Sequence, residues 1–190
     1  IDDSYKIEDY TVPSFTQFLI AKETAKANPT DANMEALSQR IAELKSYQYP
    51  YNVVVNINGD PTSRMAFAWY TNDRMTEGQL QLTPIADITN LATVFDTASE
   101  VITVTATPTP TKKSRYAIGA SGIPAATGVP QSTKYKYTSH KAIAENLTPN
   151  TTYAYRVGVE GYWSEVAYFV TAPENKVDES EEFTFIYMTD

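Results

Sequence analysis

The apolar residues of this chain change their spacing near residue 50, and this change constrains the fold more than any other feature. After Tyr51 an apolar residue recurs at every second position, as in Val53, Val55 and Ile57, and the alternation returns around Phe67. A period of two is typical of β-strands with one buried face. Many short strands separated by turn signals predict an all-β sandwich from about residue 50 onward.

The residues before this change have a helical period. Residues 14–46 are expected to form two short helices, with Ser14 and Gln17 matching a capping box at the start of the first. Asn28 precedes Pro29, and a residue before proline is pushed out of the α region. The first helix is therefore expected to end there.

The second helix carries an apolar stripe. Thr30 or Asp31 is expected to cap it. Its apolar residues then follow at spacings of three, four and three: Met34, Leu37, Ile41 and Leu44. Such a stripe predicts packing against the sandwich or against a partner domain. Self-association of two chains through the stripe is the alternative.

Composition argues against several classes of site. The formal net charge is −8, whereas a nucleic-acid-binding face would be basic. There is no cysteine and one histidine, so neither a disulfide framework nor a self-contained zinc site is expected. No apolar run approaches the ~20 residues that span a membrane. We expect no nucleic-acid partner and no membrane span.

The single histidine, His140, is predicted to be structural. It lies in an expected strand, Thr138 to Ile143. A catalytic histidine would need a partner, and neither a second histidine, a cysteine nor a serine-elbow motif accompanies it.

The clearest fold motif is L-x-P-x-T-x-Y, formed by Leu147, Pro149, Thr151 and Tyr153. Leu147 would fill the core, Pro149 would begin the turn across the sandwich, and Tyr153 would bury its ring and return its hydroxyl to the backbone. This structural corner resembles that of fibronectin type III domains. The predicted fold class is mainly β: a fibronectin type III or immunoglobulin-like antiparallel β-sandwich with an N-terminal α-helical hairpin.

A long segment interrupts the predicted strands. Residues 108–132 are rich in proline, glycine, serine and threonine, and they include the basic residues Lys112, Lys113 and Arg115. A loop of this length is either functional or mobile. It is interpreted as a solvated insertion, with a contact loop toward a neighbouring domain or an anionic substrate as the alternative.

The end of the chain predicts a second domain. Residues 174–182 have the composition of an acidic linker, and residues 183–190 alternate like a buried strand that ends in Asp190. Aspartates at strand ends are where open α/β sheets place metal and phosphate chemistry. The expected organisation is a helical extension at 1–49, the sandwich at 50–173, the linker at 174–182, and the first strand of a truncated catalytic domain at 183–190.

The order of these motifs resembles a known family. It includes Gly59-Asp60-Pro61, Phe67-Ala68-Trp69, the 147–153 corner, Trp163-Ser164-Glu165 and the run from Phe183 to Asp190. In this order the chain resembles the N-terminal domain of purple acid phosphatases and related calcineurin-like metallophosphoesterases. The resemblance covers about residues 50–190. It includes neither the helical hairpin nor the 108–132 loop.

The resemblance implies a function for a longer parent protein. A catalytic domain with two divalent or mixed-valence metal ions would follow the sandwich, and Asp190 would be its first metal ligand. No catalytic residue and no cofactor is expected within residues 1–190 themselves. Purple acid phosphatases usually have Gly-Asp at this point, whereas this chain has Thr189-Asp190. That departure favours the broader metallophosphoesterase superfamily over an iron–tyrosinate centre.

The expected function is therefore that of a non-catalytic accessory domain, which packs on the catalytic domain of the same chain or shapes access to it. Export from the cytoplasm and a possible homodimer are further expectations, the first from resemblance only. The alternative is a carbohydrate-binding or adhesion module of an exported protein. Trp69 and Trp163 could form its sugar-stacking face, although such residues more often belong to the core or the rim of a sandwich.

Overall fold

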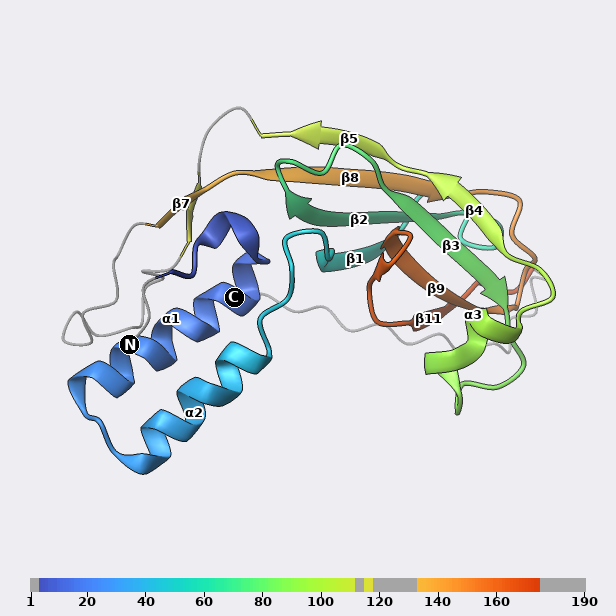
Figure 1. The fold of residues 1–190 in the computed structure, drawn as a ribbon. Helices are drawn as coiled ribbons and strands as arrows, with labels where there is room; N and C mark the ends of the chain where they lie inside the picture. Colours follow the sequence, from blue (N-terminus) through green and yellow to red (C-terminus); the bar gives the residue numbers. More distant parts are fainter. Residues whose placement is uncertain (1–3, 112–114, 118–132, 175–190) are drawn as a thin grey trace, which may run out of the picture.

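The computed structural model describes residues 4–111, 115–117 and 133–174. Its architecture is mainly β, with two antiparallel sheets and a helical pair that precedes them (Figure 1). The expected linker from residue 175 onward and the strand at 183–190 lie outside the described residues. No helix in the described segments is long and apolar enough to cross a membrane.

The helical pair consists of α1 (Val12–Ala27) and α2 (Asp31–Ala42), preceded by the short 3-10 helix η1 (Ile7–Asp9). α1 ends before Asn28-Pro29 as predicted. Thr30 caps α2, because its side chain accepts a hydrogen bond from the backbone nitrogen of Asn33 at 3.3 Å. The break and the second cap were thus correctly predicted from local sequence.

The predicted capping box at Ser14 is wrong. α1 begins two residues earlier, with Thr11 at the N-cap position and Pro13 in the first turn. Proline suits the first turn because its missing N–H would have no helical partner there. The hydroxyl of Ser14 instead accepts a hydrogen bond from the backbone nitrogen of Lys45 at 3.2 Å, which ties α1 to the end of α2.

The apolar stripe of α2 packs on α1, not on the sandwich as predicted. Leu37 is buried in a cluster with Phe15, Phe18 and Ala25 of α1. Met34 lies at the margin and is 42% exposed. The helical pair therefore has its own small core. The aromatic residues of α1 cover the stripe.

The four-stranded sheet has the order β1 (Tyr51–Ile57), β2 (Met65–Asn72), β8 (Tyr137–Ala144) and β5 (Thr107–Pro110). The five-stranded sheet has the order β10 (Tyr162–Trp163), β9 (Thr152–Val159), β3 (Gln79–Pro84) and β4 (Ile102–Thr105), with β11 (Ala167–Val170) also on β9. A separate two-stranded sheet pairs β6 (Arg115–Ala117) with β7 (Thr133–Tyr135). Between β3 and β4 the chain forms η2 (Leu91–Thr93) and α3 (Val94–Thr97), which lie at the opposite end of the molecule from the helical pair (Figure 1).

The two larger sheets share one core. Phe67 and Trp69 of β2 face Leu80 of β3 and Val157 of β9 within a single buried cluster. Alternation along β2 produces this arrangement, since every second residue of that strand is buried. The predicted sandwich of antiparallel sheets is therefore confirmed.

The predicted start of the loop at 108–132 is wrong, because the first residues of this range belong to a strand. Residues Thr107–Pro110 form β5, which pairs with β8 through Pro108 opposite His140. Proline is tolerated here because β5 is an edge strand and its outer side needs no ladder hydrogen bonds. Residues 118–132 lie outside the described residues, as do Lys112 and Lys113.

Candidate functional site

The four predicted corner residues lie together at the start of β9. Leu147 and Tyr153 are each 3% exposed. The Tyr153 hydroxyl accepts a hydrogen bond from the backbone nitrogen of Thr148 at 3.0 Å. The Thr151 hydroxyl donates to the carbonyl of Pro149 at 3.0 Å and closes the turn. The corner contains no group arranged for chemistry, so its contribution is to the fold.

Two further residues complete this corner. Thr171 is 1% exposed; its hydroxyl donates to the carbonyl of Thr148 at 2.6 Å and accepts from the nitrogen of Thr151 at 2.9 Å. Asn150 holds a positive φ of 48°, a conformation that asparagine tolerates better than most residues. Sequence reasoning missed Thr171, because it lies 20 residues beyond Thr151 and carries no local turn signal.

His140 lies inside the sandwich core. Its side chain is fully buried, and its ring stacks on Trp69 with centroids 5.4 Å apart. Nε2 lies 2.8 Å from the hydroxyl of Thr71, whereas Nδ1 is buried without a partner in the described structure. Burial lowers the pKa of His140 to about 4, so the ring is neutral at physiological pH. The environment is that of a core residue.

Gly78 allows this close packing. A Cβ atom at residue 78 would lie 2.7 Å from Nδ1 of His140 and 3.0 Å from the Trp69 indole, closer than real Cβ contacts. Trp69 is fully buried here, so it cannot stack on a sugar. The inward register of β2 places Trp69 in the core, as expected more often for such a residue, and not on a sugar-binding face.

The described residues do not fit a metal centre. No group of three or more His, Cys, Asp or Glu side chains in these segments could hold a metal ion. Asp190, the predicted first metal ligand of a longer protein, lies outside the described residues.

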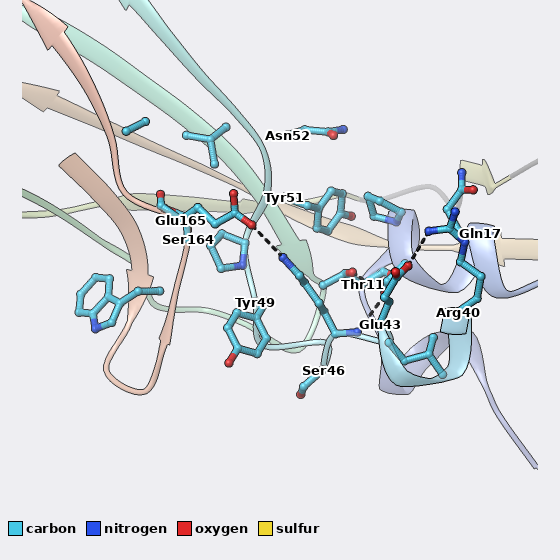
Figure 2. A pocket seen from close by; sticks show the side chains of 18 of the residues that line it. Thr11, Gln17, Arg40, Glu43, Ser46, Tyr49, Tyr51, Asn52, Ser164 and Glu165 are labelled. Atoms are coloured by element: carbon cyan, nitrogen blue, oxygen red, sulfur yellow. Dashed lines mark hydrogen bonds and ion pairs between the residues drawn. The ribbon is translucent and has the colours of Figure 1, made fainter. Parts of the chain in front are cut away.

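A groove of 1110 Å³ lies between the helical pair and the sandwich (Figure 2). Its walls come from the start of α1, the connection between α2 and β1, and the edge of the five-stranded sheet. Lys45 of the connection and Glu165 of the sheet edge form an ion pair across it, with Nζ and Oε1 3.6 Å apart. Arg40 pairs with Glu43 on the helical side. Because these charges are exposed and paired, the groove presents little net charge.

Aromatic side chains form the other wall of the groove. Trp163 and Tyr49 both line it, and the Tyr49 ring contacts that of Tyr162 edge-on at 5.3 Å. Trp163 is held by Arg156, whose guanidinium lies 4.4 Å from the indole and 4.5 Å from the Phe95 ring on α3. The orientation of Trp163 is therefore fixed by packing.

Arg156 itself is anchored to the sheet. Its Nε donates to Gln81 of β3 at 2.8 Å. Burial lowers the pKa of Arg156, while the nearby carboxylates of Glu160 and Asp96 act in the opposite direction. The groove lining includes no histidine or cysteine. We conclude that the groove offers an aromatic binding surface, and that its charged lining side chains form ion pairs with one another.

Three contacts outside the groove join the end of β2 to η1 and to the connection that follows α2. The Asn72 side chain at the end of β2 donates to the carbonyl of Glu8 at 3.3 Å. Arg74 lies over the Tyr47 ring at 4.8 Å and pairs with Asp9 at 3.6 Å. The groove is thus bounded by elements that contact each other directly.

Comparison with protein families identifies the sandwich. A family model described as "Purple acid Phosphatase, N-terminal domain" matches residues 50–171. The chain belongs to this family. The match begins just before β1 and ends just after β11, so the purple acid phosphatase N-terminal domain comprises both sheets, and the helical pair lies outside it.

Comparison with solved structures gives distant similarities. The purple acid phosphatase PPD1 from yellow lupin (Lupinus luteus) seeds is 15% identical with a TM-score of 0.41, and the match covers 66% of this chain. Astrotactin-2, a vertebrate-specific, perforin-like membrane protein, is 13% identical with a TM-score of 0.38 over 68% of this chain. The matches cover 20% and 23% of those two chains. No curated protein sequence gives a significant match.

Proposed function

We propose that this chain is the non-catalytic accessory domain of a metal-dependent phosphoesterase, and that it packs on the catalytic domain or shapes access to it. The observation that carries the proposal is the match of the purple acid phosphatase N-terminal domain to residues 50–171, the whole of the two-sheet sandwich. The corner around Tyr153 supports a finer assignment as well. We propose that the sandwich is of the fibronectin type III kind.

The proposal extends to the longer protein. Its partner would be its own C-terminal catalytic domain, with Asp190 as the first ligand of two metal ions. A carboxylate at the end of a predicted buried strand supports that role, because such strand ends carry the metal chemistry of open α/β sheets. With Asp190 among their ligands, such metal ions would supply activated water for the hydrolysis of a phosphoester. Export from the cytoplasm and a homodimer belong to the same proposal.

The test compares residues 1–190 with the protein extended through a following catalytic domain. We expect two bound metals and turnover of p-nitrophenyl phosphate only in the extended protein. Asp190→Asn in that protein should remove most turnover and lower the metal content, while Thr189→Ala serves as the matched neighbour. An extended protein with neither bound metal nor turnover would contradict the phosphoesterase assignment. Light scattering of both proteins tests the homodimer.

One observation favours a second candidate function, a carbohydrate-binding module. Tyr49 and Trp163 both line the groove, and aromatic rings are common sugar-stacking surfaces. Glycan binding by residues 1–190, abolished by Trp163→Ala and unchanged by Tyr168→Ala on the exposed face of β11, would support it. Absence of binding across a broad glycan panel would remove it.

A further inference from the structure

Four tyrosines surround a second, smaller pocket, where the first turn of α1 meets the four-stranded sheet. The pocket has a volume of 450 Å³, within the range of about 300–1,000 Å³ typical of small-molecule sites. Its lining includes Tyr51, Tyr70, Tyr135 and Tyr137, with Val12 and Pro13 from α1. The family match does not include α1, so part of this pocket lies outside the shared sandwich.

The tyrosine rings form a continuous series with different tilts. Tyr51 and Tyr70 meet edge-on, with centroids 6.1 Å apart and planes at 66°. Tyr70 and Tyr137 are 4.6 Å apart at 50°, and Tyr137 and Tyr135 are 6.1 Å apart at 35°. A sugar ring stacks one face of C–H groups on a single aromatic platform. Rings that are tilted around a hollow suit a rounded group instead.

Tyr51 offers its ring and not its hydroxyl. The hydroxyl oxygen is buried and has no hydrogen-bond partner among the described residues. Burial, together with the nearby phenols of Tyr135, Tyr137 and Tyr70, raises the pKa of Tyr51 above its ordinary value. The ring therefore stays neutral at physiological pH. What Tyr51 can give an occupant is the negative face of its π system.

Charged residues lie beside this pocket and not in its described lining: Arg115 is the register partner of Tyr135, and Lys136 follows Tyr135 in the chain. Among the described residues, no Lys, Arg or His lines it, and Asn52 is the one polar lining residue apart from the tyrosines. An adjoining hollow is also lined by Val12 and Tyr135. Its charged lining residues are two acidic ones, Glu8 and Asp73, and one basic one, Lys136. The whole chain has a net charge of −8.

We propose that the tyrosine pocket binds a small alkylated ammonium group through cation–π contacts. Aromatic rings arranged around a hollow recognise such cations because the ring faces are negative and the methyl groups fill apolar space. The site is independent of the phosphoesterase assignment, so either proposal can fail without the other.

The test titrates residues 1–190 with choline, with a trimethyl-lysine peptide, and with 3,3-dimethylbutan-1-ol, the neutral isostere of choline. Binding is followed through the NMR signals of the tyrosine rings at constant ionic strength. We expect saturable shifts with at least one of the cations and about tenfold weaker binding of the neutral alcohol. Saturable binding of either cation supports the proposal. The cation that binds more tightly shows whether the ammonium group comes from a small molecule such as choline or from a methylated lysine.

Substitutions separate ring contacts from hydroxyl contacts. Tyr70→Leu should weaken the binding of the cation about tenfold, whereas Tyr70→Phe, which keeps the ring, should retain it. Tyr137→Leu provides a second variant if Tyr70→Leu does not fold. Tyr168→Leu, on the exposed face of β11 away from the pocket, is the matched control.

Three results would overturn the proposal. The first is equal affinity for the neutral alcohol, which would make the pocket merely apolar. The second is loss of binding in Tyr70→Phe, which would indicate recognition by hydroxyls. The third is the absence of any saturable shift of the tyrosine signals with either cation.

Discussion

The helical pair and the sandwich are held together in different ways. The helical pair buries four apolar residues, all within residues 15–37. Among the described residues, the core cluster of the sandwich contains twelve buried apolar residues, from Met65 to Val157, and its two sheets are assembled from strands far apart in sequence. Contacts that are local in sequence form and break with little effect elsewhere, whereas a shared long-range core is lost all at once. We therefore expect the sandwich to unfold as one unit and the helical pair to open separately.

The largest expected effect is from a cavity in the sandwich core. Phe67 is 2% exposed and contacts the rings of Tyr155 and Phe169 at 5.1 Å and 5.7 Å. Phe67→Ala should lower the free energy of unfolding by about 3–5 kcal/mol, because it removes both transfer energy and packing. Urea denaturation followed by tryptophan fluorescence measures it. A loss below about 1 kcal/mol would contradict a single shared core.

The second effect is an acid sensitivity confined to the sandwich. His140 has a pKa of about 4 in the folded state against an ordinary value of 6.5, so the unfolded chain binds the proton more tightly. The free energy of unfolding should therefore rise by about 3 kcal/mol as the pH increases from about 4 to 6.5. The same amount should be lost when the pH is lowered through this range. Denaturant midpoints measured across this range test it.

His140→Gln should flatten this dependence on pH, even if it lowers stability overall. The exposed carboxylates of Asp60 and Asp87, whose pKa values are lowered by hydrogen bonds from Thr62 and Thr89, titrate below this range. A slope that persists in the variant would assign the effect to other groups.

A smaller effect is expected at the corner. Tyr153→Phe removes the hydroxyl that accepts from the nitrogen of Thr148 and leaves that donor unpaired. The expected loss is about 1–2 kcal/mol. Tyr168→Phe on exposed β11 is the matched control and should change the free energy of unfolding very little. Equal effects of the two substitutions would show that the corner hydrogen bond contributes nothing.

The smallest effect on the stability of the sandwich is expected from a substitution in the core of the helical pair. Phe18 is 1% exposed and packs against Phe15 and Tyr5. Phe18→Ala should expose the amides of α1 and α2 to hydrogen exchange, while the unfolding of the sandwich changes by less than about 1 kcal/mol. Loss of protection in β2 and β9 would show that the two regions are one cooperative unit.

Several sequence predictions failed where a distant segment decided the outcome. Ser14 matched a capping box, but its hydroxyl donates to the carbonyl of Thr11 and accepts from the backbone nitrogen of Lys45, 31 residues away. Pro108 suggested a loop, yet it lies in β5 because that strand occupies the edge of a sheet. The sequence left a core position and a sugar-stacking surface both open for Trp69, and its burial beside His140 was decided by the packing of β2 against β8. In each case the competing interaction joins residues that no local pattern connects.

The sequence by itself determined the elements and the corner. The change of period near residue 50, the break at Asn28-Pro29 and the motif ending in Tyr153 each depend on backbone sterics and local alternation, which a short stretch of sequence contains. Only the tertiary structure decided which surfaces meet. The packing of α2 on α1, the aromatic groove at Trp163 and the tyrosine pocket around Tyr51 all depend on long-range burial, because side chains from separate strands and helices become neighbours only after the core has formed.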